Sequence, residues 1–198
     1  YFENLLFYLE MNHLETKLNE ATQVYMIGAG PGDPNLRTVM AYRVISEAEV
    51  LLYDDLVDEK ILNLTPPIAE RFYVGRRYGS NRDQTVRQQR TEQIYKSKVN
   101  EGKLVVRMKS GDPLIFSRAA EEIAFLESQD ISFELIPGIS AGVAAASALK
   151  LPLTKRLHSR TLVFSLGRTS NDDIVHLDQI SRLIAQGNPL LLYMAKSR

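Results

Sequence analysis

From Gln23 onward, short apolar runs alternate with longer amphipathic stretches. The apolar runs predict strands at residues 24–28, 50–53, 71–74, 104–108, 132–136, 161–166 and 189–193. The amphipathic stretches predict helices at residues 36–48, 58–63, 84–101, 117–129, 139–149 and 176–186. Because strands that alternate with helices are typical of parallel sheets, this pattern predicts an α/β protein with a largely parallel sheet. Ligands bind beyond the carboxyl ends of such strands, which is where the Gly- and Asp-bearing turns of this sequence fall.

Two further segments stand outside this alternation. Residues 3–20 are rich in Leu and Glu, with apolar positions at helical spacing, which predicts a helix that docks on another surface, such as a partner chain. Pro and Gly interrupt the pattern within residues 137–155, which predicts a domain boundary there.

The charge balance and the absence of cysteine narrow the function classes. The chain has 24 basic and 24 acidic residues, so no overall field favours nucleic acid or an anionic membrane as a partner. Without Cys there is no disulfide framework, thiolate metal site or Cys nucleophile, which fits a cytoplasmic protein. His13, His158 and His176 do not have the spacing of metal ligands, so we expect no metal site.

The most informative turn is GAGPGDP at residues 28–34, directly after the first predicted strand. Its three glycines allow the backbone to turn tightly and to approach a ligand closely. A dinucleotide-binding turn would need a glycine at Asp33, and a carboxylate there would repel a pyrophosphate. The turn therefore argues against an NAD-dependent dehydrogenase, although Asp54 has about the spacing of a ribose-binding acid. A tight turn without a ligand is the alternative.

Two more turns of this kind follow later strands. The turn SGDPLIF at residues 110–116 repeats the Gly-Asp-Pro sequence, and we expect the two Gly-Asp-Pro turns to form opposite walls of one cleft. The third turn, PGISAG at residues 137–142, leads into a helix of small residues. After the second turn, Arg118, Glu121 and Glu122 begin a helix, where glutamates also suit the positive helix end. Solvated capping glutamates and a surface ion pair for Arg118 are the alternative interpretation.

Residues 71–90 contain six arginines against a single acid, Asp83. Such a segment is suited to binding a polyanion through bidentate carboxylate or phosphate contacts. A solvated surface is the more common explanation of a charge run.

Taken together, these motifs resemble the tetrapyrrole methylase family, and within it the methyltransferases that act on uroporphyrinogen III. The resemblance runs from about Gln23 to the last residue. It is carried by residues 24–36 (with GAGPGDPNL), 52–57 (LYDDLV), 73–77 (YVGRR), 105–122 (VVRMKSGDPLIFSRAAEE), 136–141 (IPGISA), 151–156 (LPLTKR) and 191–194 (LLYM).

The resemblance implies two α/β domains with mainly parallel sheets and a cofactor cleft between them, usually in a homodimer. It implies an N-terminal methylase domain at residues 23–137 and the start of a C-terminal methylase domain at residues 138–198, which we expect to be incomplete in this chain. Residues 1–22, a helical extension or linker, resemble the end of the dehydrogenase–chelatase module that precedes the methylase in bifunctional siroheme synthases.

The implied activity is C-methylation of uroporphyrinogen III to precorrin-2, through precorrin-1, in siroheme and cobalamin biosynthesis. The implied methyl donor is S-adenosyl-L-methionine, which leaves as S-adenosyl-L-homocysteine. The alternatives are another precorrin methylase and a catalytically incomplete fragment that acts only as a binding or interaction piece.

The resemblance also implies roles for individual residues. Asp54 matches the proton acceptor, and Arg76 stands where the family usually has a lysine described as a proton donor. A guanidinium does not release its proton near neutral pH, so Arg76 either binds a substrate carboxylate only or the donor assignment fails here. The positions associated with substrate binding are Arg118, Glu121 and Arg156. The positions associated with the cofactor are Gly30, Pro31, Ser110, Gly111, Asp112, Ile115, Ser140, Ala141 and Met194.

Overall fold

The computed structural model describes residues 18–75, 84–167 and 177–195. The chain divides between Gly138 and Ile139 into two compact units, which are described separately below. Most of the helix expected at residues 3–20 lies outside the described residues, and the described residues 18–20 are not helical.

The first unit contains a five-stranded sheet in which every pairing is parallel. Its strand order is β3-β2-β4-β1-β5. The strands are β1 (Val24–Gly28), β2 (Val50–Tyr53), β3 (Glu70–Tyr73), β4 (Val105–Lys109) and β5 (Phe133–Ile136). All five residues of β1 and of β4 are buried, as the apolar runs of central parallel strands require, whereas the edge strands β3 and β5 are partly exposed.

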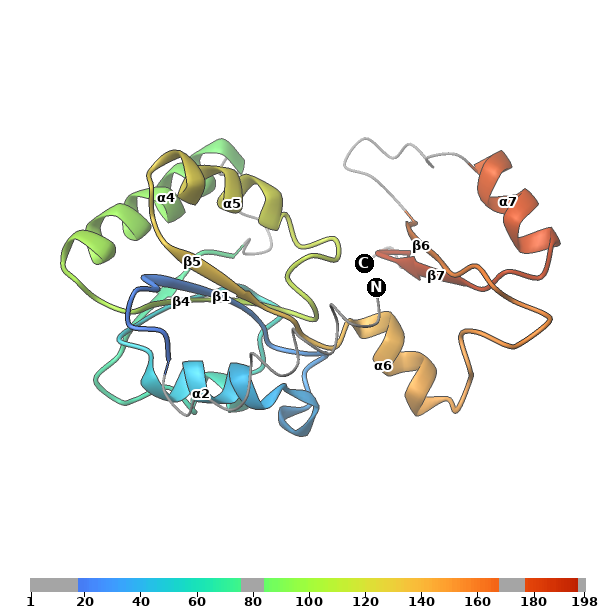
Figure 1. Cartoon of the computed structure of the whole chain (residues 1–198), viewed down its shortest axis with the longest axis horizontal. Helices are drawn as coiled ribbons and strands as arrows, with labels where there is room; N and C mark the ends of the chain where they lie inside the picture. Colours follow the sequence, from blue (N-terminus) through green and yellow to red (C-terminus); the bar gives the residue numbers. More distant parts are fainter. Residues whose placement is uncertain (1–17, 76–83, 168–176, 196–198) are drawn as a thin grey trace, which may run out of the picture. The chain divides into compact units, whose positions relative to one another are not determined.

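Helices cover both faces of this sheet (Figure 1). Helix α2 (Val39–Glu47) packs Ala41, Val44 and Ile45 against one face, and the side chain of Thr38 accepts a hydrogen bond from the Ala41 N–H at its start. Helices α4 (Gln84–Asn100) and α5 (Ala119–Ser128) cover the other face. Two shorter elements complete the unit, the 3₁₀ turn η1 (Pro34–Leu36) and helix α3 (Glu59–Leu62).

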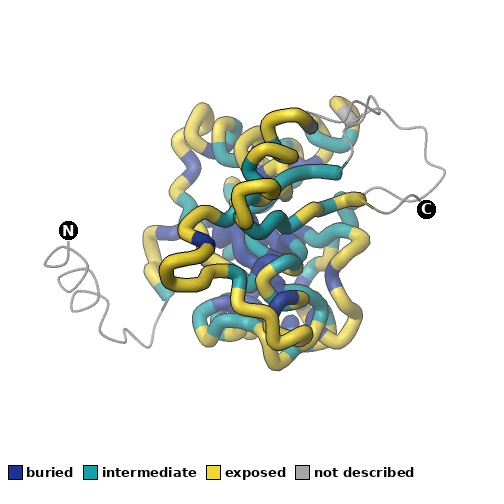
Figure 2. The backbone as a smooth tube through the Cα atoms, turned by 90° about the vertical axis from the view of Figure 1, so that its right-hand side faces the viewer, coloured by how far each residue is buried: buried dark blue, intermediate teal, exposed yellow. Residues whose placement is uncertain are grey.

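The core of the first unit consists of two apolar clusters, one on each face of the sheet. Tyr25 and Leu51 belong to the cluster beneath α2, while Tyr95 of α4 and Leu126 of α5 pack with Val105 in the other. Figure 2 shows this buried interior in dark blue. The packed sheet holds its strand ends, and therefore the turns that follow them, in fixed positions.

The second unit has a two-stranded parallel sheet of β6 (Val163–Leu166) and β7 (Leu190–Tyr193). Two helices accompany this sheet, α6 (Ala141–Ala148) and α7 (Leu177–Ala185). Neither strand of this sheet contains a buried residue, since β6 and β7 consist of partly buried and exposed residues.

The α/β fold class with a mainly parallel sheet is confirmed, and each predicted strand is present with ends within two residues of the prediction. Three predicted helices, α2, α5 and α6, begin two or three residues later than expected. Helix α2 starts at Val39 because η1 and the capping Thr38 precede it. Helix α5 starts at Ala119 because Arg118 has a left-handed backbone, with φ of 60°.

Candidate active site

The two Gly-Asp-Pro turns meet directly at the carboxyl ends of the neighbouring strands β1 and β4. The Gly30 N–H donates to the Gly111 carbonyl at 3.2 Å, and the Gly111 N–H donates to the Gly30 carbonyl at 2.8 Å. Both glycines have positive φ, 76° and 69°, which other residues adopt only at a cost. The expectation that these turns form opposite walls is wrong at this point, because the backbones are paired with no space between them.

The third turn also reaches this junction. A Cβ atom on Gly138 would lie 2.1 Å from the Gly111 carbonyl oxygen, and a Cβ on Gly28 would lie 2.5 Å from the Gly138 Cα. Backbone therefore contacts backbone where the turns after β1, β4 and β5 meet. Only glycine fits at these two positions without moving the chain.

The aspartates of the two turns hold the backbone in place. The Asp112 carboxylate accepts from the Gly138 N–H at 3.0 Å and from the Leu114 N–H at 2.8 Å, so it ties the second turn to the third. Asp33 accepts from the Asn35 N–H at 2.8 Å and so caps η1. Asp33, whose carboxylate argued against a pyrophosphate site, and Asp112 are thus structural groups of their turns.

The backbone of these turns is suited to contact with a ligand. At Gly32 a Cβ atom would meet nothing within 4 Å, so space is open beside the first turn. Pro31, Ser110, Asp112 and Ile115 are all partly exposed around the Gly30–Gly111 junction. The structure therefore brings together every first-unit residue that the resemblance assigns to the cofactor.

Asp54 directly follows β2, the strand next to β4. Its side chain is 27% exposed, and its Oδ2 lies 3.6 Å from Nη2 of Arg107 on β4. Its Oδ1 is buried and has no hydrogen-bond partner among the described residues. A buried carboxylate oxygen without a donor is costly, unless a proton or a donor group from a ligand reaches it.

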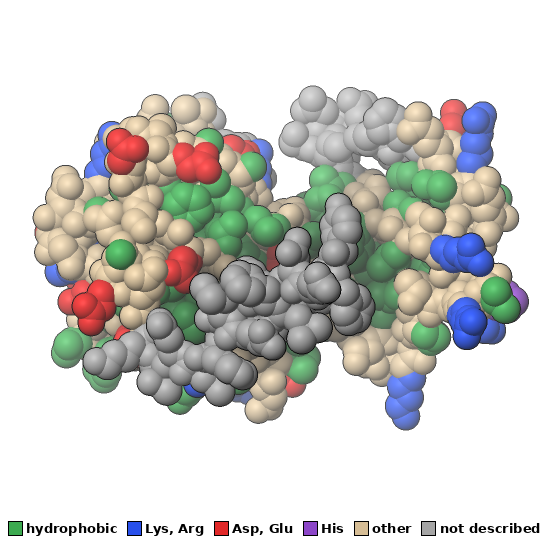
Figure 3. Space-filling view, viewed as in Figure 1, with side chains coloured by type: hydrophobic (Ala, Val, Ile, Leu, Met, Phe, Trp, Pro, Cys, Tyr) green, Lys and Arg blue, Asp and Glu red, His purple; other side chains and the backbone are tan. Residues whose placement is uncertain are grey.

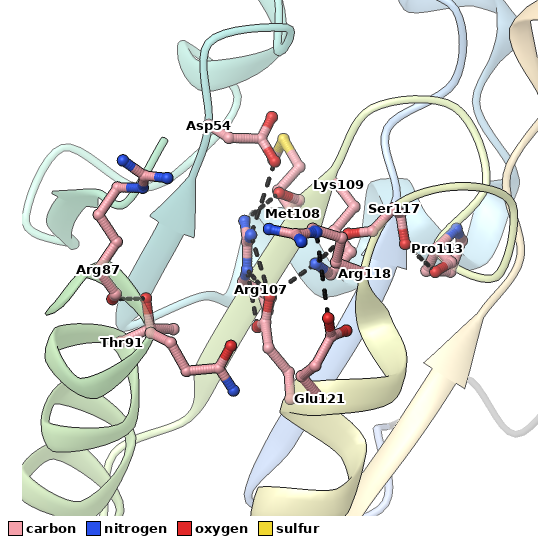
Figure 4. Close-up of polar contacts among 12 residues, drawn as sticks. Asp54, Arg87, Thr91, Arg107, Met108, Lys109, Pro113, Ser117, Arg118 and Glu121 are labelled. Carbon is pink, nitrogen blue, oxygen red and sulfur yellow. Dashed lines mark hydrogen bonds and ion pairs between the residues drawn. The ribbon is translucent and has the colours of Figure 1, made fainter. Parts of the chain in front are cut away.

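Arg107 lies between two carboxylates beneath the strand ends. Its Nε donates to Glu122 at 3.0 Å, its Nη1 donates to the Met108 carbonyl at 2.7 Å, and its Nη2 faces Asp54 (Figure 4). Burial disfavours the charged guanidinium, but attraction to Glu122 and Asp54 outweighs burial and raises the pKa of Arg107. Arg107 is therefore a permanently charged neighbour of Asp54.

Glu122 joins several groups in this buried network. Lys109 Nζ donates to its Oε1 at 2.6 Å, and the Tyr95 hydroxyl donates to its Oε2 at 2.6 Å. Burial opposes the ionised carboxylate, but Arg107 and Lys109 more than offset burial and lower the pKa of Glu122 to about 2. The interpretation of Glu122 as a solvated capping residue is wrong, since it is 9% exposed and fully hydrogen-bonded.

The first predicted substrate-binding pair lies on the surface next to this network. The Nε of Arg118 is 4.0 Å from Oε1 of Glu121, and the two side chains are 60% and 44% exposed. In Figure 4 the Arg118 side chain points toward Glu121. A pair this exposed contributes little to stability.

In the second unit one hydroxyl organises a predicted cofactor residue. The Tyr193 hydroxyl lies 2.6 Å from Ser140 Oγ and accepts from the Gly142 N–H at 3.2 Å, at the start of α6. Ser140 is buried, whereas Ala141 is exposed at the first turn of the helix. Met194, which follows Tyr193, is 63% exposed and has a left-handed backbone with φ of 54°.

Two predicted residues remain, Arg156 and Arg76. Arg156 is exposed in a turn closed by the Lys155 and Ser159 backbones. Arg76 lies outside the described residues. Gly75, just before it, packs against the chain at Asp54, where a Cβ atom would lie 2.9 Å from the Asp54 Cα.

Sequence reasoning missed Arg107, Lys109, Glu122 and Tyr193 as parts of the site. The signal for the first two was present, since alternate residues of the β4 run VVRMK are basic although the run is otherwise apolar. Charged residues within a central strand indicate buried partners. For Glu122 and Tyr193 the sequence carries no comparable signal.

Neither a membrane span nor a metal site emerges from the part of the chain that the structure describes. Each described helix is too short or too polar to cross a bilayer. No group of three or more His, Cys, Asp or Glu side chains in that part is arranged to hold a metal ion.

The chain was compared with protein families, curated proteins and solved structures. Residues 23–198 match the family model described as Tetrapyrrole (Corrin/Porphyrin) Methylases. A siroheme synthase of Ectopseudomonas mendocina is 40% identical over 174 residues, which cover 87% of this chain and 36% of that protein. A uroporphyrinogen-III C-methyltransferase of Methanocaldococcus jannaschii is 37% identical over 170 residues, 86% of this chain and 69% of that protein. The chain therefore spans about a third of the siroheme synthase and about two thirds of the single-function relative.

Solved structures give the same result. The native uroporphyrin III C-methyltransferase of Thermus thermophilus superposes with a TM-score of 0.71 at 35% identity, over 88% of this chain and 71% of that one. A structure of the Thermus thermophilus enzyme complexed with S-adenosylhomocysteine superposes with a TM-score of 0.68 at 32% identity, over 89% of this chain and 67% of that one.

The acid stability of the first unit tests the Glu122 network. The pKa of Glu122 is lowered from 4.5 to about 2, so the stability it contributes is present above pH 4.5 and is lost as the pH falls toward 2. Glu122→Gln is expected to lower the free energy of unfolding at pH 7 by about 3 kcal/mol. The variant should also lose less stability between pH 4.5 and 2, as measured by urea unfolding.

Glu127→Gln, an exposed change on the same helix, serves as the control. Equal acid sensitivity of Glu122→Gln and the wild type would contradict the network.

Proposed function

This chain belongs to the tetrapyrrole (corrin/porphyrin) methylase family, and on that premise we propose that it catalyses S-adenosylmethionine-dependent C-methylation of uroporphyrinogen III to precorrin-2, through precorrin-1. The Methanocaldococcus jannaschii relative carries the name of this activity, and the Thermus thermophilus relative was solved with S-adenosylhomocysteine. The observation that carries the proposal is Asp54, whose buried Oδ1 lacks a partner among the described residues at the carboxyl end of β2.

The proposed methyl donor supplies an electrophilic methyl group on a sulfonium. The backbone of the Gly30 and Ser110–Asp112 turns, with Pro31 and Ile115, would hold it in the first unit. Ser140, Ala141 and Met194 are the proposed contacts in the second unit. The paired glycines leave the turn backbone unobstructed, which is the condition for a close approach of a ligand. Rigid placement of donor and acceptor is the main source of rate enhancement in such a transfer, worth about 7–11 kcal/mol at best.

Asp54 is the proposed proton acceptor. A pyrrole carbon attacks the methyl carbon, the carbon–sulfur bond breaks with its electron pair going to sulfur, and the methylated macrocycle then carries one extra positive charge. Loss of a proton removes that extra charge, and Oδ1 of Asp54, which has no partner among the described residues, is suited to take that proton directly or through a water. The Nη2 of Arg107 lies 3.6 Å from Oδ2 of Asp54 and fixes one side of this carboxylate.

Uroporphyrinogen III carries eight carboxylates, so its binding requires cations. Arg118 in the first unit and Arg156 in the second are exposed and are the proposed partners, with Glu121 beside Arg118. Arg76 is proposed as a further substrate ligand and not as a proton donor, since guanidinium stays charged. In the described part of the second unit the basic residues Lys150, Lys155, Arg156, Arg160 and Arg182 stand against one acid, Asp178. Basic side chains are visible on this unit in Figure 3.

The alternative within the family is another precorrin methylase. A cobalt precorrin-4 methyltransferase structure also superposes, with a TM-score of 0.68 at 27% identity. The turnover test below, with uroporphyrinogen III as the substrate, distinguishes the two. A role in siroheme or cobalamin biosynthesis, in the cytoplasm, is part of the proposal.

Cofactor identity is tested by isothermal titration calorimetry. The protein is expected to bind S-adenosylhomocysteine and to show no heat of binding with NAD, because Asp33 stands where a dinucleotide turn needs glycine. Gly111→Val is expected to weaken the binding at least tenfold, since a β-branched residue strains the backbone at φ of 69°. Binding of NAD in place of S-adenosylhomocysteine would overturn the methylase assignment.

Substrate identity is tested by turnover. Uroporphyrinogen III with S-adenosylmethionine is expected to give the dimethylated product, detected by absorbance and mass. Asp54→Asn keeps the shape of the side chain but removes the proton acceptor, so kcat is expected to fall about 10²–10⁴-fold. The neighbouring exposed acid gives the control, Asp58→Asn. Unchanged turnover in Asp54→Asn would refute the role of Asp54 while leaving the activity itself standing.

We further propose that the protein is a homodimer, as the resemblance implies. Light scattering is expected to give twice the mass of one chain over a range of concentrations. A monomeric mass at all concentrations would contradict this assignment.

A further inference from the structure

Four charged side chains meet beneath the carboxyl ends of β2 and β4: Asp54, Arg107, Lys109 and Glu122. They comprise two anions and two cations, so the cluster is neutral as a whole. Arg107, Lys109 and Glu122 are buried, with side chains 6%, 3% and 11% exposed, while Asp54 is 27% exposed. Asp54 is therefore the member of this cluster that a ligand reaches most readily.

Glu122 is the group to which the other buried members bind. Both its oxygens accept from Arg107, Oε1 also accepts from Lys109, and Oε2 accepts from Tyr95. Lys109 donates as well to the Ser117 carbonyl at 2.9 Å, in the loop that leads to α5. Glu122 is thus held by strand β4, helix α4 and its own helix α5 at once.

This arrangement leaves Arg107 little freedom. Glu122 binds Nε and Nη2, and the Met108 carbonyl binds Nη1, so both sides of the planar guanidinium are fixed. The Nη2 atom shared with Glu122 is also the one that lies 3.6 Å from Asp54. A shift of Glu122 would therefore change the distance between Arg107 and the carboxylate of Asp54.

We propose that Glu122 is a positioning residue for the methyl-transfer reaction, which fixes the Arg107 guanidinium and through it the orientation of the Asp54 carboxylate. This inference rests on the proposed function, in which Asp54 accepts the proton. Glu122 itself is buried, and its carboxylate is bound by Arg107, Lys109 and Tyr95. It therefore acts on the proton-transfer step and not on the binding of the methyl donor.

The first test separates kcat from binding. Glu122→Gln keeps the size of the side chain but loses the charge that holds Arg107. Its kcat is expected to fall by up to about 100-fold, as for a displacement of about 1 Å at a reacting group, with the Kd for S-adenosylhomocysteine unchanged within about twofold. Glu122→Asp, which keeps the charge, is expected to recover part of the rate. Glu127→Gln on the exposed side of α5 should match the wild type.

A charge-matched double variant distinguishes a positioning role of Glu122 from a role in stability alone. Glu122→Gln combined with Lys109→Gln removes one anion and one cation, so the buried cluster keeps its net charge of zero. If Glu122 serves stability alone, this double variant should recover the wild-type kcat. We expect kcat to stay low, because Arg107 still lacks its carboxylate partner, and full recovery would overturn the proposal.

Coupling to Asp54 gives the second test. If Glu122 acts through Asp54, Glu122→Gln should lower kcat no further in the Asp54→Asn background. Independent, multiplying losses would overturn the proposal.

A crystal structure of Glu122→Gln supplies a readout that does not depend on turnover. The Arg107 guanidinium is expected to move away from Asp54, and an unchanged Arg107–Asp54 pair would overturn the inference. A wild-type protein without activity on uroporphyrinogen III would instead refute the proposed function. The two failures are thus distinguishable.

Discussion

The buried ion pair between Arg107 and Glu122 is the interaction on which the charged cluster at the carboxyl ends of β2 and β4 depends. Removing two charges from water is costly, and attraction between them repays that cost only when their remaining hydrogen bonds are also satisfied. Lys109 and Tyr95 satisfy Glu122, and the Met108 carbonyl satisfies Arg107. The pair joins α5 to the central strand β4 and faces Asp54 at the end of β2. The electrostatics of the candidate site thus arise from the core of the fold.

Much of the architecture could be predicted from the sequence, because the period of apolar residues reports burial directly. The apolar run at residues 24–28 predicted the strand β1, and GAGPGDP predicted a turn at its end. Helix starts were less predictable, since they depend on single residues. Thr38 caps α2, and Arg118 adopts a left-handed backbone that no pattern of hydrophobicity encodes.

The contacts of the site were harder to predict than its location. Parallel strands align their carboxyl ends, so the two Gly-Asp-Pro turns after β1 and β4 were expected to lie near one another, as walls of one cleft, but they pair directly instead. Their pairing through Gly30 and Gly111 follows from the strand order, which local sequence does not specify. The same holds for Glu122, whose partners are on β4 and α4. A carboxylate at the start of a helix has the same sequence pattern whether it faces solvent or the core.

The contact between Gly28 and Gly138 has a consequence for how this fold can vary over evolution. Where two side chains are in contact, a larger residue at one position can be compensated by a smaller residue at the other. Here two backbones meet, with a carbonyl of a third segment beside them, and neither glycine has a side-chain atom whose removal could make room. Drift at either position is therefore blocked however the other residue changes. This crossing of the chains can therefore be kept only with glycine at both positions.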